Sequence, residues 1–298
     1  MTEKKDHSVI KTGCEALTAC LPDHSSIPRL GLGTWHMGEN PQIEEQEISA
    51  LQAGIKLGMT LIDTAEMYGN GRSEQLVGKS IQGFNREKLY LVSKVYPHNA
   101  GRKNIFNSCE NSLKRMNTDY LDLYLLHWRG GVPLSETVAC MEQLKADGKI
   151  RNWGVSNFDI DDMKELWNVP SGNKCAVNQV LYHLGSRGIE FSLLPWLQEH
   201  GVQTMAYCPT AQGGTLRRGL LTSKAVLEIA KIHDATPVQI LLSFLLYQKD
   251  TLVIPKSSTA AHTIENAGAS LIQLTQDDIF CLSREFPAPT RKTHLDLL

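Results

Sequence analysis

Short apolar runs alternate along the chain with longer segments in which apolar residues recur every three or four positions. The short runs are rich in Val, Leu and Ile, and their length of four to seven residues suits buried strands. The longer segments have the spacing of helices that cover a sheet. The pattern predicts eight strands, at residues 29–34, 59–63, 89–94, 121–127, 150–156, 176–179, 202–207 and 251–255.

Helix start signals support this alternation. The segments 73–79 and 135–148 begin at a serine, and the segment 236–246 begins with Thr236 and Pro237, residues favoured where helices start. Strict alternation of strand and helix indicates a parallel sheet. No Pro-, Gly- or Ser-rich linker divides the chain, so an α/β fold of the closed (β/α)8 TIM-barrel type is favoured over an open doubly wound sheet.

Further segments are expected to decorate a single barrel domain. Residues 1–26 are predicted to form an N-terminal extension with part of a hairpin, and residues 27–298 to form the barrel. Additional helices are predicted near 237–248 and 275–285.

Composition and charge indicate a folded protein and argue against binding to nucleic acid or membranes. The 298 residues are 42% hydrophobic and 21% charged, as in a folded protein with a substantial core. Thirty Lys and Arg against 32 Asp and Glu give a net charge of −2. The chain as a whole therefore has no positive charge that would favour binding to nucleic acid or to an anionic membrane. The expected partner is a small molecule.

The sequence also predicts a cytoplasmic location. Its first residues are charged, and the segment 9–17 is interrupted by polar residues, unlike the core of a signal peptide. No run approaches the roughly 18 apolar residues of a membrane span. The seven cysteines are scattered without a C-x-x-C pair, which fits reduced thiols and predicts no metal site.

Polar side chains stand at the carboxyl end of every predicted strand. In a TIM barrel these ends form the active face, so such residues are site candidates. The recurrence at eight ends favours a functional origin over coincidence. The candidates are Thr34 and Trp35, Asp63, Lys94, His127, Ser156 and Asn157, Gln179, Tyr207, and Lys256.

Three of these ends would meet Tyr68, which follows Asp63 by five residues on a loop. A lysine ammonium beside a phenol stabilises the phenolate, so Lys94 is expected to lower the pKa of Tyr68 and make it a general acid. Asp63 would hold Lys94 charged, and His127 would orient a carbonyl oxygen beside the phenol. The four residues together would polarise and protonate a C=O bond.

Each residue also has a structural explanation. Tyr68 could cover part of the core from its loop, and Asp63 and Lys94 could form an ion pair at the barrel rim. His127 could be a hydrogen-bonded core histidine. Their placement on successive strands favours the catalytic interpretation.

Protonation is only half of a carbonyl reduction, so a hydride donor is required. The motif Gly31-Leu-Gly-Thr-Trp-His36 lacks the third glycine and the adjoining helix of a dinucleotide-binding Rossmann turn. TIM barrels instead bind phosphate in the loops after strands 7 and 8. There Tyr207 could stack on a nicotinamide, and Lys256 with Ser257 could bind a phosphate; core packing and a solvated lysine are the alternatives.

Seven motifs, in order, resemble the aldo-keto reductase superfamily over about residues 27–290. The resemblance implies a monomeric (β/α)8 barrel that uses NADPH without metal or flavin. It also implies a catalytic tetrad of Asp63, Tyr68, Lys94 and His127, with Tyr68 as proton donor. The motifs are Gly31-Leu-Gly-Thr-Trp35, Leu61-Ile-Asp-Thr-Ala-Glu-Met-Tyr-Gly69, Val92-Ser-Lys94, the stretch 119–127, the stretch 148–157, Asn178-Gln179 and Ile254-Pro-Lys-Ser257.

The resemblance further implies which residues bind the cofactor. The carboxamide would be held between strands 5 and 6, the nicotinamide would lie on Tyr207, and the 2′-phosphate would lie on Lys256 and Ser257. The whole implied set is Gly33, Thr34, Asp63, Ser156, Asn157, Gln179, Tyr207, Cys208, Pro209, Gln212, Ile254, Lys256, Ser257, His262, Glu265 and Asn266.

Two positions depart from the pattern of the family. Cys208 stands where a serine is common, which places a thiol beside the cofactor and suggests sensitivity to oxidants. His262 stands where an arginine commonly clamps the 2′-phosphate. A mostly neutral imidazole gives up a bidentate cationic contact, so the preference for NADPH over NADH is expected to be weaker than usual.

An apolar cleft for a small carbonyl compound is expected beside the tetrad. The loops 128–133 and 211–218 are expected to close over it, and the tail 286–298 to reach the barrel mouth. The stretches Asp-Thr-Ala-Glu-Met-Tyr and Leu-Leu-His-Trp resemble a bacterial branch of reductases for methylglyoxal and other small aldehydes. The residues expected to line the cleft are Trp35, Tyr68, Tyr96, His127 and Trp128, with Met37 nearby.

Two other functions compete with an active reductase. Some relatives hold NADPH as regulatory subunits of membrane channels, and a phosphate-handling isomerase could use the same barrel. The intact tetrad favours turnover. In an isomerase, Tyr207 and the polar residues Ser156, Asn157 and Gln179 would have no assigned role.

Overall fold

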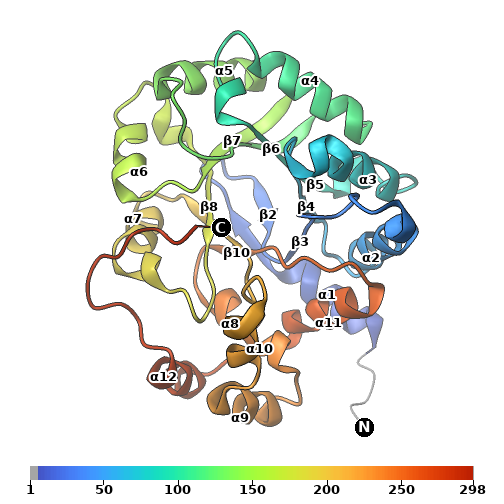
Figure 1. Ribbon diagram of the computed structural model, residues 1–298, viewed down its shortest axis with the longest axis vertical. Coiled ribbons are helices and arrows are strands. Elements are labelled where there is room, and N and C mark those ends of the chain that lie inside the picture. The colour runs from blue at the N-terminus through green and yellow to red at the C-terminus, as the bar shows by residue number, and fades with distance from the viewer. Residues whose placement is uncertain (1–5, 298) are drawn as a thin grey trace.

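Eight parallel strands form the centre of the computed structural model, which describes residues 6–297 (Figure 1). They pair in chain order, and bridges from Leu30 to Val253 and from Gly33 to Lys256 join the first to the last. The sheet is therefore closed, and the predicted TIM barrel is confirmed. The strands are β3 Gly31–Gly33, β4 Leu61–Asp63, β5 Tyr90–Val95, β6 Leu121–Leu126, β7 Ile150–Ser156, β8 Val177–Leu181, β9 Gln203–Tyr207 and β10 Thr251–Val253.

Helices surround the strands as an outer ring (Figure 1). The ring helices are α2 Glu44–Lys56, α3 Arg72–Ser80, α4 Ile105–Met116, α5 Leu134–Ala146, α6 Ile160–Trp167, α7 Leu193–Glu199, α10 Pro237–Tyr247 and α11 Ala260–Ala267. Outside the ring lie α1 His7–Ala16, α8 Gly214–Leu221, α9 Lys224–Ile232 and α12 Gln276–Glu285. Single 3-10 turns are η1 Pro41–Ile43, η2 Tyr68–Gly71, η3 Arg86–Lys88, η4 Pro97–Asn99, η5 Gly172–Lys174, η6 Gly188–Phe191 and η7 Gly268–Leu271.

The helix α10 belongs to the barrel, although it was expected to be an addition. Its sequence is apolar nearly all round, and such a helix is stable only when it is buried. Its Ile240, Leu242 and Phe244 are fully buried, and it packs on β10. A capping box between Thr236 and Gln239 starts the helix where the sequence predicted.

No single helix in residues 6–297 is long and apolar enough to cross a membrane. The pair α9 and α10 reaches that length and composition only together, across a bend of 89°. Since α10 is a ring helix that packs on β10, its apolar sequence is explained by burial against the barrel.

The N-terminal region closes one end of the barrel. The helix α1, which the sequence did not predict, buries Ile10 and Cys14 against the rest of the chain. The expected hairpin is confirmed as β1 Thr18–Cys20 and β2 Ser26–Pro28, so the domain boundary drawn at 26/27 falls within β2. Leu21 and Ile27 of this hairpin join the apolar cluster that fills the barrel interior. Residues 1–5 lie outside the described part.

Ile27 is expected to stabilise the fold without affecting chemistry at the other end of the barrel. Because its side chain is fully buried, Ile27→Ala should lower the free energy of unfolding by about 2 to 4 kcal/mol. Urea unfolding measures the loss, and the exposed neighbour Ser26→Ala is the matched control. A loss no larger than that of the control would contradict the role of the hairpin as an apolar plug.

Candidate active site

A cleft of about 430 Å3 opens at the carboxyl ends of the strands, where the sequence predicted the site. The register helps assemble it, because Gly33 pairs with Asp63 and Ser156 pairs with Gln179 on neighbouring strands. The predicted residues that line the cleft are Gly33, Thr34, Trp35, Asp63, Tyr68, His127, Trp128, Ser156, Asn157, Gln179, Tyr207, Cys208, Pro209, Gln212, Ile254 and Lys256.

Lys94 lies fully buried beneath this cleft on β5. Its ammonium donates to Asp63 Oδ2 at 2.7 Å, to the Thr64 carbonyl at 2.9 Å and to the Tyr68 hydroxyl at 3.0 Å. All three of its protons therefore have acceptors, which is the condition for keeping a buried ammonium charged. The predicted contact between an acid, a lysine and a phenol is present.

The pKa of the Tyr68 phenol differs from the expectation. Burial raises it above its ordinary value, while the Lys94 ammonium acts in the opposite direction. The sequence predicted only the effect of lysine, because the extent of burial depends on the whole mouth of the barrel. For Lys94, burial favours the neutral amine, but Asp63 and Tyr68 together raise its pKa. Tyr68 is thus a protonated phenol held against a persistent cation.

His127 faces Tyr68 from the end of β6. The ring centroids lie 5.7 Å apart in an edge-on arrangement. Burial and the nearby Lys94 charge lower the pKa of His127 to about 2, so the imidazole is neutral at physiological pH. Its Nδ1 is buried and has no hydrogen-bond partner among the described residues. A neutral ring of this kind can donate one hydrogen bond but does not supply a charge.

Amide side chains complete the floor of the cleft. Gln179 donates from Nε2 to Asp63 Oδ1 at 2.8 Å, so it orients the carboxylate that holds Lys94. Asn157 accepts from the Tyr207 hydroxyl at 2.9 Å and donates to the His127 carbonyl at 3.3 Å. These amides therefore tie β6 to β9 as well as lining the site.

Several residues that line the cleft have a strained backbone conformation. Non-glycine residues with left-handed φ angles cost conformational energy and are frequent at functional sites. Four such residues line the cleft, namely His36, Asn157, Cys208 and Ala211, with φ between 50° and 60°. Gly33 has a different constraint, since a β-carbon there would come within 2.8 Å of the Ile254 carbonyl where the barrel closes.

Four predicted cofactor residues lie beyond the lining of the cleft. Ser257 is buried and donates to the Thr259 carbonyl, and His262 is exposed on the first turn of α11. Glu265 and Asn266 follow on the same helix. Nearby, Lys256 lines the cleft and donates to the Ser258 hydroxyl at 2.6 Å, without a carboxylate partner in the described part of the chain.

One cation of the cleft was not predicted from the sequence, and two residues predicted in or near the cleft lie elsewhere. Arg217 lines the cleft from α8 and donates to the Thr210 and Ala211 carbonyls, a contact that no local motif announces. Met37 is fully buried in the core and does not line the cleft. Tyr96 packs edge-on behind Trp128, with ring centroids 5.8 Å apart, one ring away from the cleft.

The C-terminal tail crosses loops at the rim of the barrel mouth (Figure 1). Lys292 lies 3.3 Å from Asp159 and 3.2 Å from Asp161, which follow β7. Asp296 accepts a hydrogen bond from Ser186, which follows β8. The tail therefore reaches the rim, as expected, but does not line the cleft.

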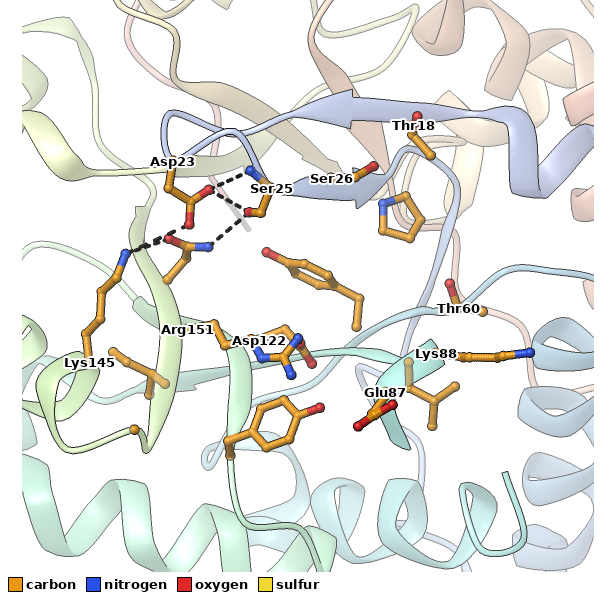
Figure 2. Close-up of a pocket in the computed structure, with 17 residues that line it drawn as sticks. Thr18, Asp23, Ser25, Ser26, Thr60, Glu87, Lys88, Asp122, Lys145 and Arg151 are labelled. Carbon is orange, nitrogen blue, oxygen red and sulfur yellow. Dashed lines mark hydrogen bonds and ion pairs between the residues drawn. The ribbon is translucent and has the colours of Figure 1, made fainter. Parts of the chain in front are cut away.

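A second cavity, of about 720 Å3, lies at the opposite end of the barrel beneath the hairpin (Figure 2). Its charges neutralise one another: Lys145 lies 4.0 Å from Asp23, and Arg151 lies 3.4 Å from Asp122. Asp122 also pairs with Arg86 at 2.8 Å. The N-terminal face of a TIM barrel generally serves stability, so the candidate active site is the first cleft.

No group of three His, Cys, Asp or Glu side chains within residues 6–297 is placed to hold a metal ion. The groups available for chemistry are instead a phenol, an ammonium, a carboxylate and a neutral imidazole. This set can protonate and polarise a carbonyl group but cannot supply electrons. Such a site suits a barrel enzyme that acts on a carbonyl group, and a reduction there requires a separate hydride donor.

The chain belongs to the aldo/keto reductase family, whose model matches residues 29–282. It is 54% identical over 273 residues to methylglyoxal reductase YeaE of Escherichia coli K12, covering 92% of this chain and 96% of that protein. It is 35% identical to glyoxal reductase of Bacillus subtilis 168, covering 88% and 90%. A crystal structure of an aldo/keto reductase from Klebsiella pneumoniae with NADP and acetate matches with a TM-score of 0.92 at 49% identity, covering 95% and 99%.

Cys208 is expected to react slowly despite its place in the cleft. Burial raises the pKa of its thiol to about 11, so little thiolate is present near neutral pH. This opposes the oxidant sensitivity that the sequence suggested. In a timed reaction with iodoacetamide at pH 7.5, mass spectrometry should show Cys208 labelled more slowly than the exposed Cys20. Equal rates would mean that the cleft activates the thiol.

Proposed function

We propose that the chain reduces small dicarbonyl compounds such as methylglyoxal and glyoxal with NADPH. The observation that carries the proposal is the Tyr68 hydroxyl held 3.0 Å from an ammonium that is itself bonded to Asp63. The identity of 54% to a methylglyoxal reductase supports the substrate class. The NADP in the Klebsiella pneumoniae structure supports the cofactor.

The residues of the cleft fit a nicotinamide dinucleotide. Ser156, Asn157 and Gln179 offer polar groups for a carboxamide, and Tyr207 offers a ring surface. Lys256 and Arg217 have no carboxylate partner in the described chain, and a phosphate would supply the missing anion. When bound there, the cofactor supplies a hydride to the carbonyl carbon.

The proton comes from Tyr68. A carbonyl oxygen between Tyr68 and His127 accepts a hydrogen bond from the neutral imidazole and the proton of the phenol, which completes the alcohol. Lys94 stabilises the phenolate left behind, and Asp63 keeps Lys94 charged and aimed. Water restores the proton of Tyr68.

Aromatic side chains favour a small, uncharged substrate. Trp35 and Trp128 line the cleft next to the tetrad, and Trp128 packs against His127 with centroids 4.9 Å apart. Because the 430 Å3 cleft also has to accept the nicotinamide, little volume remains for the substrate. Tyr96 would support this wall rather than contact the substrate.

We also infer a monomer that acts in the cytoplasm. The monomer is what the resemblance to the aldo/keto reductase family implies. All seven cysteines are free, which fits a reducing compartment.

Tyr68→Phe should abolish turnover while leaving cofactor binding intact. Removing the general acid is expected to lower kcat about 100- to 10,000-fold, because the phenyl ring cannot donate a proton. The loss of NADPH absorbance with methylglyoxal measures turnover, and quenching of protein fluorescence measures NADPH binding. If the native chain binds NADPH but oxidises it no faster than the variant, the chain is a cofactor-binding protein and not a reductase.

His262→Arg should strengthen the preference for NADPH. An arginine can form a bidentate contact with the 2′-phosphate that an imidazole cannot, so the Kd of NADPH is expected to fall about tenfold with little change for NADH. Fluorescence titration with both cofactors measures the change. Ala261→Arg adds the same charge one exposed residue away and serves as the control. Equal effects of the two variants would show that position 262 does not face the phosphate.

A further inference from the structure

Glu66 connects two loops of the active site but has no role in the proposed chemistry. It lies on the loop after β4, two residues before Tyr68. Its Oε1 accepts from the backbone N–H of Tyr96 at 2.7 Å and from Asn99 Nδ2 at 3.2 Å. It forms no ion pair with any described Lys, Arg or His. Its carboxylate is therefore committed to the loop after β5.

That loop supports the wall of the substrate cleft from behind. It contains the η4 turn, and Tyr96 at its start packs edge-on against Trp128 at an interplanar angle of 87°. The two loops also meet at a second point, because Gly130, on the loop that carries Trp128, lies against Pro97. A β-carbon on Gly130 would come within 2.4 Å of Pro97 Cβ. The loop that carries Trp128 thus rests on a turn that Glu66 holds in place.

We propose that Glu66 is a positioning residue that fixes Trp128 and so sets the affinity for the carbonyl substrate. The identity of the substrate rests on the proposed function. Glu66 reaches the cleft through Tyr96 and Trp128. Its backbone N–H donates to the Lys94 carbonyl at 3.3 Å, a contact that an alanine keeps. Among the described residues, its side chain forms hydrogen bonds to Tyr96 and Asn99 and to none of the cofactor residues or the Tyr68 hydroxyl. Its removal should therefore change substrate binding without changing proton donation or cofactor binding.

Glu66→Ala is expected to raise KM for methylglyoxal about tenfold, because two hydrogen bonds to a carboxylate are lost. The value of kcat should stay within about twofold, and the Kd of NADPH should not change. Glu66→Gln should remain close to the native chain, since its amide oxygen can accept the same two hydrogen bonds. Glu87→Ala removes an equal charge at the opposite end of the barrel and is the control.

A double-mutant cycle with Trp128→Ala tests the route of the effect. If Glu66 acts through Trp128, Glu66→Ala should raise KM no further in the Trp128→Ala background. Additive increases in KM, or a fall in kcat as large as the rise in KM, would overturn the proposal.

Hydrogen exchange tests the positioning role of Glu66 independently of the proposed enzymatic activity. Glu66→Ala should speed exchange in residues 96–99 and 128–131, whereas Glu66→Gln and Glu87→Ala should not. If the native chain does not reduce methylglyoxal, the proposed function fails, and the exchange data still test the anchor. Unchanged exchange in both segments would overturn the positioning role of Glu66.

Discussion

A buried ammonium needs an acceptor for each of its protons, and Lys94 imposes this requirement on the whole mouth of the barrel. Its three acceptors come from the segment 63–68, which must leave β4 and turn back over β5. Taking such a charge out of water costs several kcal/mol, and the ion pair and hydrogen bonds offset this cost only when their geometry is good. Gln179 on β8 holds the other oxygen of Asp63 at 2.8 Å, so the requirement extends across the barrel. The position of Tyr68 is a consequence of satisfying Lys94.

The closed sheet makes this arrangement rigid. Strand register sets Gly33 beside Asp63, and the bridge from Gly33 to Lys256 joins the first strand to the last. Hydroxyl groups strengthen the join: Ser73 donates to Thr34 Oγ1 at 2.8 Å, and Thr34 donates to the Asp63 carbonyl at 2.9 Å. The residues that would bind a cofactor and those that would donate a proton thus belong to one hydrogen-bonded frame, which keeps the reacting groups in place.

The sequence predicts those features that depend on local pattern. Apolar runs with polar residues at their ends predicted the eight strands and the candidates at their ends, because strand ends of a barrel share one face. The resemblance to a family added Cys208, Pro209 and Gln212 to the predicted lining. Features that depend on distant partners were missed. The helix α1 is stabilised by η7 near the other end of the chain, and Arg217 enters the cleft through a turn of α8. The pKa of Tyr68 moved opposite to the expectation, since burial by several loops outweighed one neighbouring charge.

We propose that Lys94 favours the phenolate of Tyr68 and thereby makes Tyr68 a proton donor. NMR titration of tyrosines labelled at Cζ tests it directly, with the Tyr68 signal assigned by its loss in Tyr68→Phe. The pKa of Tyr68 should be higher in Lys94→Met than in the native chain by about one unit or more, while Lys94→Arg should shift it less. An unchanged or lower pKa of Tyr68 in Lys94→Met would show that Lys94 does not stabilise the phenolate.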